Sequence, residues 1–427
     1  MHPGNIGVWA TGDGSVAMLQ GFVVLNVALY YSYAYQFLWG KVGIPIKPVM
    51  WYGFTLSVGM FLYLIKRRQI VLDTITMHFI AWAFALFFYA GLSSILVSGG
   101  TPEGVQAVIA LGEVLALAVV FSLLFGYRNT QRVAAYAVLI AVVCGVLINC
   151  LDFATKGSLG LSSVPGRAAG FYENSNMSGK YLVFGMGLSV GVVPKRWRWL
   201  YCLLVATGVF VTFSRSSMMM WALTVVLVAW FGGFLFSRAL SLGLIGALLV
   251  VLGTTLVAGE WGDHVRQFGL GEYLDKNTSA RISSGFVGQG DYSSHERALV
   301  AEMGLERFLQ APFLGLGIGA TRTWEFGVST HNQYLQVGAE LGAVGLAFLL
   351  ALIWLLWRTA TAPGRVTALL YAFSCVFTHN NLDSPAMAIV WALAVTLGAK
   401  AAGVVVSTSP LARPHGRREQ RHTTPHA

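Results

Sequence analysis

A histidine at the end of a long polar segment is the residue best placed for proton transfer. His331 occurs in Thr330–His331–Asn332–Gln333–Tyr334, where this polar segment meets an apolar stretch. A neutral imidazole at such a boundary can take a proton from an incoming hydroxyl group, a contribution typically worth about 10²–10⁴ in rate. The alternative is a structural histidine that only forms hydrogen bonds beside Asn332. We predict His331 as a general base, with Asn332 and Tyr334 as binding residues beside it.

Four arginines stand out in the polar segments that separate apolar stretches: Arg167, Arg215, Arg281 and Arg297. A guanidinium group stays charged and binds two oxygens in a fork, so arginine suits phosphate groups. Group transfer on the outer side of a bacterial inner membrane has no ATP available. It therefore needs a donor that arrives activated, and a lipid-linked diphosphate sugar meets that need. We predict that these arginines bind a diphosphate.

Each arginine also has a plainer interpretation, which the sequence leaves open. Arg215 lies in a tight break between two apolar runs and could extend to lipid headgroups. Arg167 could pair with Glu173 in the same loop. Arg297 could belong to a solvated helix face, and Arg281 lies in a Gly-rich segment with no distinguishing neighbour.

Weaker candidates lie at other breaks. His379, followed by Asn380, Asn381 and Asp383, ends an apolar stretch and is a second histidine candidate. Glu113 lies near the middle of an apolar stretch, where an ionisable group is either functional or a protonated structural residue. The run Gly315–Gly319 follows Pro312 and lacks the lysine of a phosphate-binding loop, so it predicts a turn. No carboxylate cluster suggests a metal site, and we expect neither a metal nor a cofactor.

The composition places these residues in a membrane protein. Of 427 residues, 56% are hydrophobic and 11% are charged, and the mean hydropathy is +0.65. This excludes a soluble enzyme, a disordered protein and a disulfide scaffold. Apolar stretches long enough for a helix across about 30 Å of hydrocarbon predict about twelve transmembrane helices and an all-α polytopic fold. They run near Val16–Trp39, Met50–Ile65, Met77–Val97, Val105–Phe125, Val133–Cys150, Met177–Val193, Leu200–Phe213, Ser217–Phe236, Ala239–Ala258, Gln333–Trp357, Val366–Phe377 and Pro385–Val406.

The positive residues predict the orientation of these helices. Lysines and arginines concentrate in every second connection, which identifies the cytoplasmic side and puts both termini there. The residues concerned are Lys66, Arg67, Arg68, Arg128, Arg132, Lys195, Arg196, Arg198, Arg238, Arg358 and Arg365. Much of the net charge of +10 is therefore a topology signal, and we expect no nucleic-acid partner. The first helix would be an uncleaved anchor.

A long outer segment separates the ninth and tenth predicted helices. It covers about residues 259–331, and a helix near residues 294–310 begins with Ser293 and Ser294 followed by Glu296, a typical capping pattern. We predict one membrane domain, residues 1–427, that carries this outer loop as a cap. Residues 407–427 form a basic cytoplasmic tail.

Several motifs together resemble the O-antigen ligase family, within the wider ligase and polymerase superfamily of bacterial membrane glycosyltransferases. The motifs are Gly170–Phe171–Tyr172–Glu173–Asn174–Ser175–Asn176, Phe213–Ser214–Arg215–Ser216, Arg297 with Pro312–Phe313–Leu314–Gly315–Leu316–Gly317, and His331–Asn332–Gln333–Tyr334–Leu335–Gln336 with Glu340–Leu341–Gly342 and Gly345. They span the middle and latter half of the chain. The family often has Asn-Pro-Asn where this chain has Asn174–Ser175–Asn176, and an aromatic residue where it has Glu302.

The resemblance implies a GT-C-like glycosyltransferase with its active site facing the periplasm. It would transfer a glycan polymer from undecaprenyl diphosphate to the lipid A-core oligosaccharide, with inversion and without a metal. Membrane lipids surround it. Arg215 and Arg297 would hold the diphosphate and His331 would be the general base. The donor site would be lined by Arg167, Asn174 and Asn176. Asn332, Tyr334, Arg281 and His379 are further candidate substrate-binding residues.

Two other functions remain open on the sequence alone. An O-antigen polymerase shares the donor but uses a second lipid-linked glycan as acceptor, and only the single late loop ending at His331 favours a ligase. A flippase for lipid-linked oligosaccharides would carry ionisable residues along a path through the membrane midplane. Most candidate charges of this chain lie at one rim, which favours transfer over transport.

Overall fold

Helices make up most of the part of the chain that the structure describes. The computed structural model describes residues 14–127, 129–155, 157–161, 167–234, 292–322, 330–359 and 361–397. Within these ranges every regular element is a helix, as expected where lipid offers no partner for free backbone groups. The predicted all-α membrane class is confirmed at this level.

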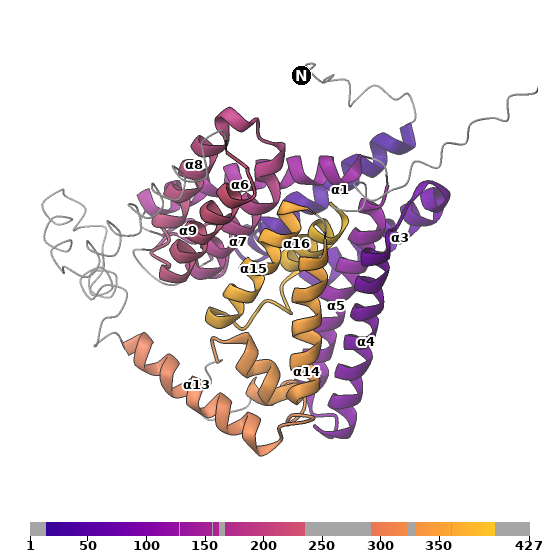
Figure 1. Ribbon diagram of the computed structural model, residues 1–427, viewed down its shortest axis with the longest axis vertical. Helices are drawn as coiled ribbons and strands as arrows, with labels where there is room; N and C mark the ends of the chain where they lie inside the picture. The colour runs from indigo at the N-terminus through magenta and orange to yellow at the C-terminus, as the bar shows by residue number, and fades with distance from the viewer. Residues whose placement is uncertain are drawn as a thin grey trace, which may run out of the picture.

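Six of the described helices are long and apolar enough to cross a membrane. They are α1 (Gly14–Tyr31), α3 (Pro48–Lys66), α4 (Thr74–Leu96), α5 (Pro102–Phe125), α6 (Thr130–Ala154) and α14 (Gln333–Arg358). Figure 1 shows α4, α5 and α14 as long, roughly parallel helices on one side of the molecule. Apart from α1, each begins and ends within a few residues of an apolar stretch predicted from the sequence.

The remaining described helices of the predicted set are shorter. They are α7 (Ser175–Ser189), α8 (Arg198–Phe210), α9 (Arg215–Trp230), α15 (Ala362–Phe377) and α16 (Pro385–Thr396). With a rise of 1.5 Å per residue, the 12 residues of α16 extend only about 18 Å, short of about 30 Å of hydrocarbon. The predicted ninth helix, Ala239–Ala258, lies outside the described residues. The expected count of twelve transmembrane helices is therefore not confirmed.

The first predicted helix, Val16–Trp39, is wrong as one continuous element. It divides into α1 and a short α2 (Ala34–Gly40) at Tyr33, whose φ is +59°. The Tyr33 ring is buried, and its hydroxyl pairs with that of Ser384 at 2.7 Å. The ring also lies 4.9 Å, between centroids, from Tyr172. Contacts distant in sequence thus break a helix that the apolar pattern alone would continue.

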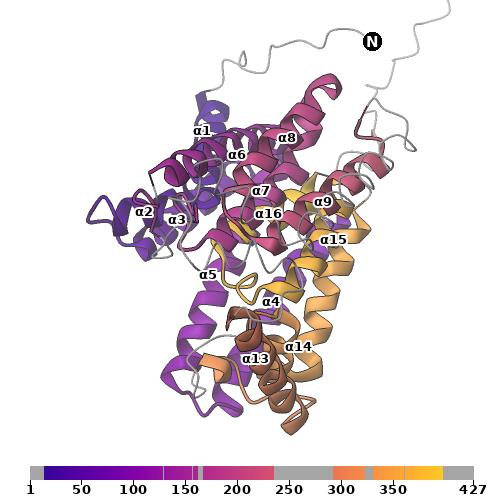
Figure 2. The ribbon, with the colours of Figure 1, turned by 90° about the vertical axis from the view of Figure 1, so that its left-hand side faces the viewer.

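Helix α16 forms the centre of the molecule. All twelve of its residues are buried, and it packs against α5 and also against α1, α7 and α15. In both ribbon views it lies among these helices, while α13 (Tyr292–Gln310) lies beside the lower end of α14, away from α8 (Figures 1 and 2). A helix that is apolar on all sides is expected to be buried on all sides.

The run Gly315–Gly319 is a closely packed turn against α14. The amide of Leu316 donates to the carbonyl of Ala339 at 2.8 Å, and that of Gly317 donates to the carbonyl of Glu340 at 3.0 Å. Helix α14 is interrupted there by Gly342, with φ +63° and ψ −160°, a conformation that is essentially restricted to glycine. The turn thereby fixes the chain that leads from α13 to α14.

Replacing Gly342 by alanine is expected to lower the thermal unfolding temperature of the detergent-solubilised protein. The new Cβ would clash with the carbonyl oxygen of Phe313, and the backbone conformation alone costs about 1–3 kcal/mol. Gly53→Ala in α3 is the matched control, because nothing lies within 4 Å of its added Cβ. Equal unfolding temperatures for the two variants would contradict this role of Gly342.

Candidate active site

A cavity of about 250 Å³ lies where α7, α9, α14 and α15 begin or end. It brings together five residues that the sequence predicts for the site: Arg167, Asn174, Asn176, His331 and His379. We call it the cationic cavity; it is also lined by Ser175, Met177, Lys180, Ser216, Met220, Ser374, Phe377, Thr378 and Asn380. Segments more than 200 residues apart in the sequence thus share one space.

Arg167 is held firmly at the wall of the cationic cavity. Its side chain is 6% exposed. Its Nε donates to the carbonyl of Thr212 at 3.0 Å, and its Nη2 donates to Oδ1 of Asn176 at 2.9 Å. The loop that carries it is organised by Asp152, whose Oδ2 accepts from the amide of Ala169 at 2.9 Å. The guanidinium is therefore fixed before any ligand binds.

Asn174 and Asn176 have different tasks at the start of α7. The Asn174 side chain caps the helix by accepting from the amide of Met177 at 2.9 Å, a typical role for asparagine at this position. Asn176 instead orients Arg167, as described above. The sequence left open an ion pair of Arg167 with Glu173 as the alternative to phosphate binding. Glu173 accepts from Gln36 Nε2 at 3.2 Å.

Lys180 is a site residue that the sequence analysis missed. It is 4% exposed and lines the cationic cavity. Its ammonium donates to Oδ1 of Asn380 at 2.9 Å and to Oδ1 of Asn381 at 3.0 Å. The sequence does contain a pattern that indicates Lys180, because an ionisable residue inside an apolar stretch is a functional candidate. Lys180 also follows Asn176 by four residues, which places both on one face of α7.

The two histidines of the cationic cavity contact each other. The rings of His331 and His379 lie 5.3 Å apart, between centroids, in an edge-to-face arrangement with an interplanar angle of 76°. His331 has a φ of +50°, uncommon for a residue other than glycine. Burial lowers the pKa of His379 to about 3, helped by the neighbouring side chains of His331, Lys180 and Arg322. His379 is therefore neutral near pH 7.

The part of the chain from α8 into α14 matches a known protein family. Residues 200–350 match the O-antigen ligase family. The resemblance seen in the sequence motifs is confirmed over this segment. A comparison with curated proteins finds no match.

The segment that matches the O-antigen ligase family contains Arg215, Arg297 and His331 but ends before His379. Arg215 is the first residue of α9 and precedes Ser216, which lines the cationic cavity. Arg297 lies within α13. Arg281, also predicted as a phosphate ligand, lies outside the described residues.

Two further residues predicted for the site form structural hydrogen bonds. The Asn332 side chain caps α14 by accepting from the amide of Leu335 at 3.1 Å. The Tyr334 hydroxyl donates to the carbonyl of Ala372 at 2.9 Å, which joins α14 to α15. Neither residue is among those that line the cationic cavity. Among the described residues, no group of three His, Cys, Asp or Glu side chains is arranged to hold a metal ion.

The low pKa of His379 predicts acid sensitivity of the fold. An unfolded histidine titrates near pH 6.5, whereas the folded residue titrates at about 3. Between these values the unfolded state binds the proton more tightly, so the free energy of unfolding falls as the pH is lowered. We expect the unfolding temperature of the wild type to drop more between pH 7 and pH 4.5 than that of His379→Gln. Parallel pH curves for the two proteins would contradict the assignment.

Proposed function

We propose that this protein transfers a glycan from undecaprenyl diphosphate to the lipid A-core oligosaccharide. The observation that carries the proposal is the cationic cavity, in which Arg167 and Lys180 share one space with His331. A diphosphate needs cations, and an acceptor hydroxyl needs a base. The match of residues 200–350 to the O-antigen ligase family supports the same reaction class.

The donor diphosphate would bind in the cationic cavity. Arg167 presents a guanidinium held in place by Thr212 and Asn176, and arginine binds phosphate oxygens in a fork. Lys180 adds a compact positive charge on α7. By resemblance to the family, Arg215 and Arg297 complete the set of diphosphate ligands. Placing the cations before binding avoids reorganisation during the reaction.

The transfer would be a single displacement. His331 takes the proton of the acceptor hydroxyl, and the hydroxyl oxygen forms a bond to the anomeric carbon of the glycan. The bond from that carbon to the diphosphate oxygen breaks, and the leaving diphosphate keeps the electron pair. The arginines and Lys180 stabilise the negative charge that develops on it. One displacement inverts the anomeric centre, and the cations take the charge role that a metal has in other transferases.

We further propose that the cationic cavity faces the periplasm and that both termini are cytoplasmic. The support comes from the lysines and arginines of the chain, which concentrate in alternate connections between apolar stretches. The positive-inside rule assigns those connections to the cytoplasm. Both lipid-linked substrates would then meet in the outer leaflet of the inner membrane.

The direct test is a reconstituted transfer reaction. Purified protein, undecaprenyl-diphosphate glycan and lipid A-core in EDTA should yield a lipopolysaccharide ladder. His331→Ala should lower the rate by about 10²–10⁴, the usual contribution of a general base. Loss of activity in EDTA with recovery on adding Mg²⁺ would overturn the metal-independent mechanism. A product consisting only of longer lipid-linked glycan would identify a polymerase instead.

Lys180→Met tests the positive charge on α7. Removing a charged hydrogen-bond donor to the diphosphate should raise the KM for the lipid-linked donor about tenfold or more, while the acceptor KM stays within about twofold. Lys180→Arg should recover part of the donor affinity. Lys195→Met, at an exposed position, is the matched control. A donor KM that is unchanged in Lys180→Met would remove this residue from the donor site.

A further inference from the structure

A second, smaller recess adjoins the cationic cavity and shares His379 with it. Its volume is about 40 Å³. Its polar lining consists of Arg322, Gln333, Gln336, Glu340 and Asp383, besides His379. We call it the amide recess. Because His379 contacts His331, the candidate general base lies close to both spaces.

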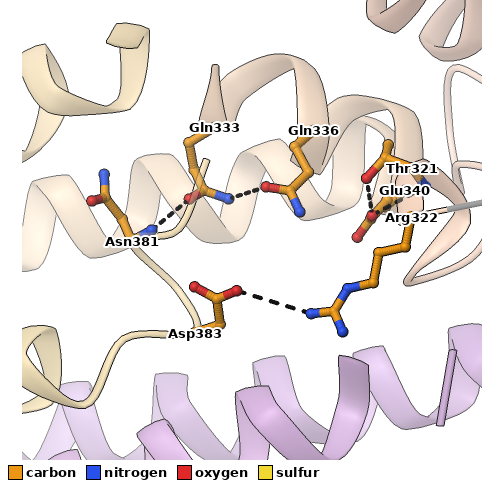
Figure 3. Close-up of polar contacts among 7 residues, drawn as sticks. All are labelled: Thr321, Arg322, Gln333, Gln336, Glu340, Asn381 and Asp383. Atoms are coloured by element: carbon orange, nitrogen blue, oxygen red, sulfur yellow. Dashed lines mark hydrogen bonds and ion pairs between the residues drawn. The ribbon is translucent and has the colours of Figure 1, made fainter. Parts of the chain in front are cut away.

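Three polar residues of the amide recess come from one face of α14. Gln333, Gln336 and Glu340 are spaced by three and four residues, and Figure 3 shows them in a row along the helix. Gln333 Nε2 donates to Oε1 of Gln336 at 3.1 Å. Gln333 Oε1 accepts from the amide of Asn381 at 3.0 Å. The row is thereby tied to the turn between α15 and α16.

An ion pair closes the other side of the amide recess. Arg322 Nη2 lies 3.9 Å from Oδ2 of Asp383, and the two side chains are 38% and 36% exposed. Figure 3 shows the guanidinium and the carboxylate pointing toward each other across the space below α14. Arg322 is positioned through its neighbour, because Thr321 donates its backbone amide to Glu340 Oε1 at 3.3 Å. Both charged groups remain accessible to a ligand.

The two spaces differ in charge. The cationic cavity carries Arg167 and Lys180 without a carboxylate in its lining. In the amide recess the single arginine, Arg322, lies beside two carboxylates, Asp383 and the buried Glu340, and the two glutamines add neutral amides. Its other walls are apolar, from Leu111, Ile318 and Leu382 among others. Amide and carboxylate groups without an excess of positive charge, beside apolar walls, suit the hydroxyl edge and the carbon face of an uncharged sugar.

We propose that the amide recess is the acceptor subsite and binds one edge of an uncharged sugar ring. This inference rests on the proposed function. A space of about 40 Å³ admits only one or two hydroxyl-sized groups, since a water molecule in the liquid occupies about 30 Å³. The rest of the ring would lie outside, at the side of His331. Gln336 and Asp383 would bind hydroxyl groups beside the one that reacts. The charged donor would then bind in the cationic cavity and the uncharged acceptor sugar in the amide recess.

The kinetic test varies the acceptor at a saturating concentration of donor. Gln336→Ala and Asp383→Asn should each raise the KM for lipid A-core at least fivefold, while the donor KM stays within about twofold. Gln310→Ala, at the exposed end of α13, is the matched control and should behave as the wild type. An unchanged acceptor KM in both variants, or a rise in donor KM instead, would overturn the acceptor subsite.

A binding test separates this proposal from the proposed function. Core oligosaccharide freed of lipid A by mild acid can be titrated onto detergent-solubilised wild type and Gln336→Ala by calorimetry. Weaker binding to the variant, with no competition from inorganic pyrophosphate, supports the acceptor subsite even where no ladder forms. Equal binding to the two proteins, or displacement by pyrophosphate, would overturn it. A wild type that binds the oligosaccharide but forms no ladder would count against the proposed function alone.

Discussion

The buried ammonium group of Lys180 must find polar partners, and the arrangement of the candidate site follows from how it does so. An unpaired charge in this position would cost several kcal/mol. Its partners, Asn380 and Asn381, lie 200 and 201 residues further along the chain. Asn381 in turn donates its amide to Gln333 on α14. This continuous network joins α7, the turn before α16 and the start of α14, and it brings His379 beside His331.

The backbone around this network is shaped by close packing. Gly342 interrupts α14 where the turn Gly315–Gly319 lies against it, and Tyr33 separates α1 from α2 where its hydroxyl reaches Ser384. Both breaks lie in stretches whose apolar pattern favours a continuous helix. In each case a group of tertiary hydrogen bonds and contacts outweighs the local preference. The segments around the candidate site therefore include irregular backbone, which packs against an apolar interior. Helix α16, all of whose residues are buried, lies in that interior.

The two adjoining spaces of the candidate site carry different charges. Arg167 and Lys180 make one space suited to a diphosphate, whereas in the adjoining space Arg322 lies beside the carboxylates of Asp383 and Glu340. His379, kept neutral by burial, stands between them. A reaction between a charged donor and a neutral acceptor benefits from this difference in charge. The donor would bind weakly in the acceptor space, and the acceptor would bind weakly in the donor space. The histidine at the junction adds no charge that would disturb this difference.

The sequence by itself determined the apolar helical class, the bounds of α14 and five of the side chains that line the cationic cavity. These features depend on composition, on helix length and on short motifs such as Asn174–Ser175–Asn176, all of which are local. Lys180, the break at Tyr33 and the pair of Arg322 with Asp383 were decided only by the tertiary structure. Each depends on a partner at least 60 residues away. No local pattern specifies such a partner, because the hydrogen bond or ion pair forms only after the helices have packed.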